Sequence, residues 1–239
     1  MDALLKDGRL SLYRTCDVGR FVRFHVLDDR QYRDAEVCSR PGMGGSANVT
    51  DTECPARRDA KRTILGSAQE AWLDHAFATS AAHWNVVVQQ SLVASLRTPS
   101  PTGDIYWTDA WDGYPAARDR LLRGLAHRRV SNPLIVGGDY HASIVVNHQS
   151  AKTPLAGEVV GTSITSPGMI ADEFNAKVAA NPAVIYGDST RRGYVLFDAN
   201  DDKIDIAIRN MMAVDRPDSL CETKARFILP QGRHAIEKA

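Results

Sequence analysis

The residues best suited to chemistry lie in the run GGDYH at positions 137–141, directly after an apolar stretch. Asp139 and His141 are two positions apart at the carboxyl end of a predicted strand, where a carboxylate oxygen and an imidazole nitrogen can point toward one place. That donor pair suits iron, zinc, manganese or calcium. The alternative is a structural pair, in which Asp139 caps a turn and His141 bonds to a backbone carbonyl, and this is the commoner role of a lone D-x-H sequence.

The spacing of apolar residues predicts the elements that position this pair. Near alternation predicts a strand over Gly19–Leu27, and a β-branched run predicts a buried strand over Trp84–Gln90. Ser67-x-x-Glu70 predicts a capping box that opens a helix from about Ala68 to Thr79. Pro115 is expected to begin an amphipathic helix, and a further helix is expected near Ile170–Ala180.

The C-terminal half is dominated by strand-like runs separated by short turns, which favours antiparallel pairing there. We therefore expect an α/β or α+β layered sandwich. A doubly wound nucleotide-binding fold is not expected, because neither GxGxxG nor GxxxxGK[ST] occurs.

Composition limits the classes of protein to consider. The 239 residues are 44% hydrophobic and 24% charged, as in ordinary globular proteins. Twenty-nine Lys and Arg balance twenty-nine Asp and Glu, so the positive field needed for nucleic-acid binding is not expected. The first residues do not resemble a signal peptide, and no apolar window reaches the roughly 18 residues of a membrane span, so the chain as written is expected to be neither secreted nor membrane-embedded.

The cysteines allow two interpretations. Cys38 and Cys54 flank a polar, glycine-rich loop that a disulfide could close, which would contribute about 3 kcal/mol to stability. Two free thiols are the equally weighted alternative. Cys16 and Cys221 stand alone, so no CxxC metal spacing is present.

Seven stretches together resemble the PhoD-type alkaline phosphatase and phosphodiesterase family of calcineurin-like metallophosphoesterases. They follow the family's order between Tyr13 and Phe227: LDDRQYR (27–33), LGSAQEAWL (65–73), WNVVVQQ (84–90), WDGYPAARDRLL (111–122), NPLIVGGDYHAS (132–143), VGTSITSPG (160–168) and RRGYV (191–195). The resemblance implies a layered α-β-β-α sandwich that is incomplete at its N-terminus. It also implies that residues 1–239 are the C-terminal portion of one PhoD-like metallophosphatase domain.

By resemblance, the chain is a metal-dependent phosphoric ester hydrolase that acts on a small phosphate ester at a cluster of Ca²⁺ and Fe³⁺ ions. The family's GDxH residues are metal ligands, which implies that Asp139 suits calcium and His141 suits iron. Asp112, Tyr114 and Arg118 match a segment near the family's site and are assigned a supporting role toward substrate or metal ligands. The alternative for Asp112 is a structural one, as a cap before the helix at Pro115.

Family members carry further metal motifs that resemble GDYxYE and DDHExxN, and neither is present here. The segment that resembles NPHI in the family is Asn181-Pro182-Ala183-Val184, which lacks the histidine. We therefore expect a truncated form with weak activity or none. An exposed core face and an open sheet edge are expected to promote association. Family members are usually exported, so the cellular location of this chain stays open.

Two other functions compete with this interpretation. Ser163 and Ser166 suggest a serine hydrolase, although the nucleophile elbow GxSxG is absent. A non-catalytic fragment or complementing module, which needs a partner that carries the missing metal motifs, is the second alternative.

Overall fold

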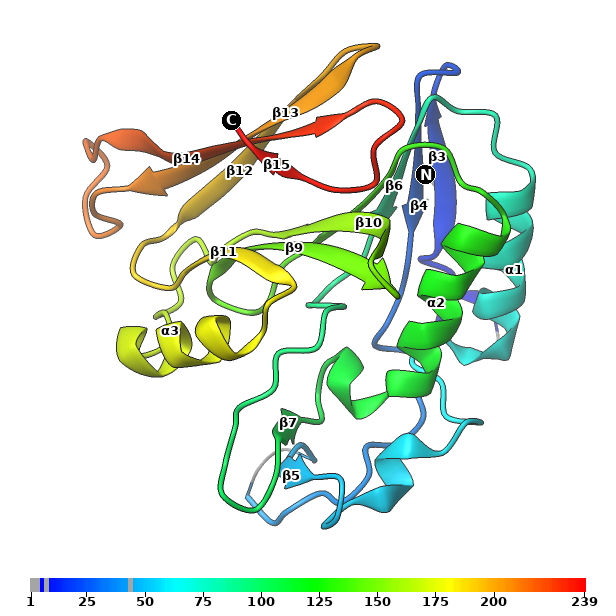
Figure 1. The fold of residues 1–239 in the computed structure, drawn as a ribbon, viewed down its shortest axis with the longest axis vertical. Coiled ribbons are helices and arrows are strands. Elements are labelled where there is room, and N and C mark those ends of the chain that lie inside the picture. The colour runs from blue at the N-terminus through cyan, green and yellow to red at the C-terminus, as the bar shows by residue number, and fades with distance from the viewer. Residues whose placement is uncertain (1–4, 7–8, 43–44) are drawn as a thin grey trace.

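A seven-stranded mixed sheet forms the middle layer of the computed structural model, which describes residues 5–6, 9–42 and 45–239 (Figure 1). The strand order is β11-β9-β10-β8-β6-β4-β3. In chain order the strands are β3 (Arg14–Val18), β4 (Val22–Val26), β6 (Trp84–Val88), β8 (Pro133–Gly137), β9 (Ser143–Ser150), β10 (Thr153–Val160) and β11 (Val184–Asp188). β4, β6, β8 and β10 run parallel, whereas β3 and β9 are antiparallel to their neighbours.

Three helices cover one face of this sheet: α1 (Gly66–Ala78), α2 (Pro115–His127) and α3 (Ala171–Ala180). α1 and α2 bury residues at helical spacing, among them Phe77 and Leu125, against the sheet residues Val87 and Ile135. Phe174 of α3 is fully buried in a separate hydrophobic cluster, which it shares with residues of β9 and β10. The helices predicted around Pro115 and Ile170 are confirmed.

A four-stranded antiparallel sheet packs on the opposite face, with the order β12-β13-β14-β15. Its strands are β12 (Gly193–Ala199), β13 (Lys203–Met211), β14 (Cys221–Pro230) and β15 (Glu237–Lys238). Alternate residues of β13 point inward, where Ile206 and Ile208 meet Trp84 and Val145 of the larger sheet. The antiparallel pairing expected in the C-terminal half is thus confirmed.

The mixed α/β layered class is confirmed, with one layer of helices and two of sheet visible in Figure 1. The outer face of the smaller sheet exposes Tyr194 and Leu196, and the expected outer helical layer is not found within the described ranges. None of the helices in the described residues combines the length and the apolar composition of a membrane-spanning segment.

Smaller elements surround the carboxyl ends of the parallel strands. β5 (Asn48–Thr50) pairs with β7 (Ile105–Trp107), β1 (Leu5–Lys6) pairs with β2 (Arg9–Leu10), and two short 3-10 helices are η1 (Pro55–Arg58) and η2 (Trp111–Gly113). Cys38 and Cys54 form a disulfide with a Cα–Cα distance of 6.0 Å. Of the two interpretations of this cysteine pair, the structure has the bonded one.

The helix predicted from about Ala68 to Thr79 is confirmed as α1, but two local details are wrong. The side chain that holds the first turn of α1 belongs to Thr63, whose Oγ1 accepts hydrogen bonds from the N–H groups of Leu65 and Gly66. Ser67 lies inside the helix, so the capping box does not form. The strand expected from Gly19 begins at Val22, because Gly19 and its neighbours make the turn between β3 and β4.

Candidate functional site

Three parallel strands place polar residues at one edge of the large sheet. β4 continues into Asp28, Asp29 and Arg30, β6 into Gln89 and Ser91, and β8 into the GDYH corner, which we define as residues 138–141. The carboxyl ends of parallel strands are where α/β sheets commonly bind ligands. A pocket of about 480 Å³ opens there, lined by Asn48, Ser91, Trp107, Asp109, Ala110, Asp139, Tyr140, His141, Gly168, Met169 and Lys177.

The GDYH corner has an unusual backbone conformation. Asp139 has φ 62° and His141 has φ 58°, both in the left-handed region that non-glycine residues rarely adopt. Between them, Tyr140 packs against the core cluster around α3, and burial raises the pKa of its phenol strongly. The half-buried Tyr140 therefore anchors the corner on the core, and it lines the pocket together with Asp139 and His141.

Gly137 allows the corner to approach β6 closely. A Cβ atom at this position would lie 2.1 Å from the carbonyl oxygen of Ser91 and 2.4 Å from Nε2 of Gln89. No side chain fits at those distances, so the glycine is required for the ends of β6 and β8 to meet under the pocket.

Arg30 joins the ends of two strands through its guanidinium group. Its Nη2 lies 2.5 Å from Oδ2 of Asp139, and its Nη1 lies 2.9 Å from Oδ1 of Asp109 in the loop after β7. Asp109 also accepts a hydrogen bond of 2.9 Å from Arg33. Burial alone would raise the pKa of Asp109, but the hydrogen bonds and charges of the two arginines outweigh it and lower this pKa.

Asp29 lies beneath the pocket and is almost completely buried. Its Oδ2 accepts a hydrogen bond of 3.3 Å from Ser91, a pocket residue, while Oδ1 has no hydrogen-bond partner among the described residues. Burial raises the pKa of this carboxyl group despite the neighbouring charge of Arg30. A buried carboxylate with a free acceptor atom is the kind of group that clusters at functional sites.

The pocket wall formed by α3 contributes Lys177, whose ammonium pKa is lowered by burial. Glu173 and Asp112 oppose this shift, so the side chain retains acidic neighbours. The pocket therefore combines a lysine, a histidine and two aspartates, a set that can bind a charged ligand and position it against His141.

Asp112 and Arg118 form an ion pair beside the pocket, and none of the three residues Asp112, Tyr114 and Arg118 is among those that line it. Oδ1 of Asp112 accepts hydrogen bonds from Ser95 at 2.8 Å and from Arg118 at 2.7 Å, and Oδ2 accepts one from the N–H of Leu96 at 3.0 Å. The hydroxyl of the buried Tyr114 donates to the carbonyl of Asp34. No side-chain hydrogen bond caps the start of α2, so the capping alternative for Asp112 is wrong.

Metal ligands of the right type are present, but too few for a cluster. Carboxylate and imidazole donors suit calcium and iron. Yet the described residues contain no group of three or more His, Cys, Asp or Glu side chains that could hold a metal ion. In addition, Asp139 is engaged by Arg30. The described donor set alone therefore does not fit the cluster of iron and calcium ions that the resemblance implies.

Four residues of this region were not predicted from the sequence: Arg30, Asp109, Ser91 and Lys177. A signal existed for Arg30 and Ser91, because each follows an apolar strand as Asp139 follows β8, and parallel strands collect such ends at one edge. Asp109 had no such signal. Its position depends on a loop that meets Arg30 from 79 residues away.

Comparisons with known proteins agree with this architecture. The family described as PhoD-like phosphatase matches residues 1–208. Alkaline phosphatase D of Bacillus subtilis (strain 168) is 33% identical over 237 residues, which cover 96% of this chain and 39% of the relative. A solved structure of PhoD, 31% identical, superposes with a TM-score of 0.86 over 99% of this chain and 45% of that chain.

The chain thus spans less than half the length of these two relatives. The family match nevertheless covers most of its residues, and the fold agrees over nearly all of them. This chain belongs to the PhoD-like phosphatase family.

Proposed function

We propose that residues 1–239 are the C-terminal portion of a PhoD-like metallophosphatase domain and contribute one side of a site that hydrolyses small phosphate esters. The observation that carries this proposal is the position of Asp139 and His141 at one pocket, on the edge of the sheet where parallel strands end. The relatives' names support phosphatase chemistry.

We propose that the metals are Ca²⁺ and Fe³⁺, with Asp139 as a calcium ligand and His141 as an iron ligand. The donor types support this assignment. The remaining ligands would come from polypeptide equivalent to the part of the relatives that this chain does not span. Asp112, Tyr114 and Arg118 would act indirectly, by holding the loop and helix beside the pocket.

A chimaera tests the proposal directly. The present chain would replace the matching segment of Bacillus subtilis alkaline phosphatase D, and turnover of an aryl phosphate monoester and diester would be measured with added Ca²⁺ and Fe³⁺. We expect metal-dependent hydrolysis that His141→Ala lowers by about 100-fold or more, because a metal ligand is lost. His75→Ala, an exposed histidine on α1, is the matched control and should leave turnover unchanged.

The isolated chain is expected to show weak hydrolysis or none under the same conditions. Robust metal-dependent turnover by the isolated chain would show that it needs no further ligands. A folded chimaera that His141→Ala leaves as active as before would remove His141 from the site.

The second candidate function is that of a non-catalytic module that binds a partner carrying the missing motifs. The observation that favours it is the pair of metal-type donors without a third in the described chain. Co-purification with a PhoD-like polypeptide that gains no hydrolytic activity on binding would support this function over the first.

A further inference from the structure

Lys177 is a cation of the pocket without a carboxylate partner. It is half-buried in the last turn of α3 and lines the pocket together with His141 and Gly168. Within the part of the chain that the structure describes, its ammonium group forms no ion pair and no hydrogen bond. Glu173 and Asp112 act on it only through their charges, at longer range. An ammonium group that is partly removed from water and unpaired favours an anionic partner.

The two carboxylates of the pocket are already neutralised by arginines. Oδ2 of Asp139 lies 2.5 Å from Nη2 of Arg30. Oδ1 of Asp109 lies 2.9 Å from Nη1 of Arg30 and 2.9 Å from Nη1 of Arg33. Of the aspartate and lysine side chains that the structure describes in the lining, Lys177 is therefore the one whose charge is not paired.

A second cation, Arg192, lies directly behind the pocket wall. Its residue is only 8% exposed, and its guanidinium donates hydrogen bonds to backbone carbonyls, among them those of Ser166 at 2.5 Å and Ser189 at 2.8 Å. A Cβ atom at Gly168, which lines the pocket, would lie 2.5 Å from Nη2 of Arg192. Asp188 attracts the guanidinium without forming an ion pair with it. Since carbonyl groups carry no net charge, Arg192 adds to the positive potential at this wall.

We infer that Lys177 binds the phosphate group of the substrate in this pocket, and that the buried charge of Arg192 strengthens the attraction. The phosphate group comes from the proposed function, on which this inference rests. Binding of the anion by Lys177 requires no metal ion. The structural alternative is that Lys177 only places a positive charge at the carboxyl end of α3, in which case the affinity for phosphate does not depend on it.

Titration calorimetry with inorganic phosphate tests this on the purified chain, without an ester or a metal ion. We expect the parent to bind phosphate and Lys177→Gln to bind it about tenfold more weakly, because a charged hydrogen-bond donor is lost. Lys177→Arg keeps the charge and should restore most of the affinity. Lys203→Gln is the matched control, since Lys203 is a half-exposed lysine on β13 that pairs with Asp205, and it should leave the affinity for phosphate unchanged.

A second measurement needs no variant and decides even if Lys177→Gln does not fold. Acetic anhydride modifies the lysines of the parent chain, and mass spectrometry gives the extent of acetylation at each. We expect phosphate to protect Lys177 and not Lys203.

Three results would overturn the role of Lys177: a parent chain that does not bind phosphate, equal affinities of the parent and Lys177→Gln, or acetylation of Lys177 that phosphate does not slow. An equal loss of affinity in Lys203→Gln would do the same, because the effect would then be one of general charge. These outcomes are distinct from a failure of the proposed function, which would appear as a folded chimaera without turnover while Lys177 still binds phosphate.

Discussion

At the scale of single residues, Asp112 joins two segments of the chain beside the pocket. Its carboxylate accepts hydrogen bonds from Ser95 and Leu96, in the loop after β6, and from Arg118 on α2. We expect Asp112→Asn to lower the free energy of unfolding by about 2–4 kcal/mol, because the nearly buried Arg118 loses its charged partner. Urea denaturation measures this loss.

Asp104→Asn is the matched control for that prediction. Asp104 pairs with Arg97, but its side chain is 33% exposed, against 7% for Asp112. An exposed ion pair contributes at most about 1 kcal/mol. Equal losses in the two variants would show that Asp112 is no more important to stability than an ordinary surface carboxylate.

At the scale of elements, the start of α1 depends on Thr63. Its hydroxyl accepts hydrogen bonds from two N–H groups that begin the helix and contacts Glu70. We expect Thr63→Ala to cost about 1 kcal/mol of stability, as the loss of a helix cap does. Ser67→Ala should change stability by only a few tenths of a kcal/mol, since Ser67 is exposed within the helix and alanine is a good helix former. Thermal unfolding of both variants would reveal the reverse order if Ser67 were the cap.

The capping error shows which parts of an element a sequence predicts. The helix itself could be predicted because Leu73, Ala76 and Phe77 repeat at helical spacing and all three are buried. Its start could not, because Ser67 and Thr63 both precede the apolar residues. The choice between them depends on Gly66, whose left-handed backbone with φ 75° packs against Tyr32.

The candidate site, like α1, could be predicted from the sequence only in part. The GDYH corner could be predicted because Asp139 and His141 come directly after an apolar strand. The partner of Asp139 could not, because Arg30 is 109 positions away and meets it only through the parallel pairing of β4, β6 and β8. Contacts between strand ends are set by the order of strands in the sheet, which apolar periodicity does not specify.

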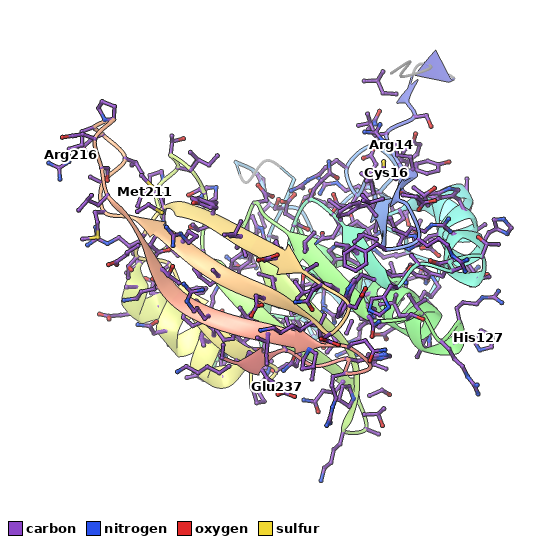
Figure 2. The ribbon with its side chains drawn as sticks, turned by 90° about the horizontal axis from the view of Figure 1, so that it is seen from above. Arg14, Cys16, His127, Met211, Arg216 and Glu237 are labelled. Carbon is purple, nitrogen blue, oxygen red and sulfur yellow. A yellow bond between two sulfur atoms is a disulfide. The ribbon has the colours of Figure 1, made fainter. Side chains whose placement is uncertain are left out.

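At the scale of the whole molecule, the large sheet ends in a strand with little protection. All five residues of β3 are exposed, and among the described residues β3 pairs only with β4, on one side. Figure 2 shows Arg14 and Cys16 of this strand far from the hairpin tip at Arg216, on the other side of the molecule. An open edge of this kind is a template for pairing with another strand.

This edge leads to a prediction about association. We expect the chain to self-associate at high concentration through β3, and Val18→Lys to shift the average mass toward that of a monomer, because a lysine on an edge strand opposes pairing. Val18 is 57% exposed, and Val214 near the hairpin tip is 48% exposed, so Val214→Lys is a matched control for general apolar exposure. Light scattering across a concentration series measures both variants. If only Val214→Lys dissociates the chains, the contact lies at the hairpin and the β3 edge is protected in solution.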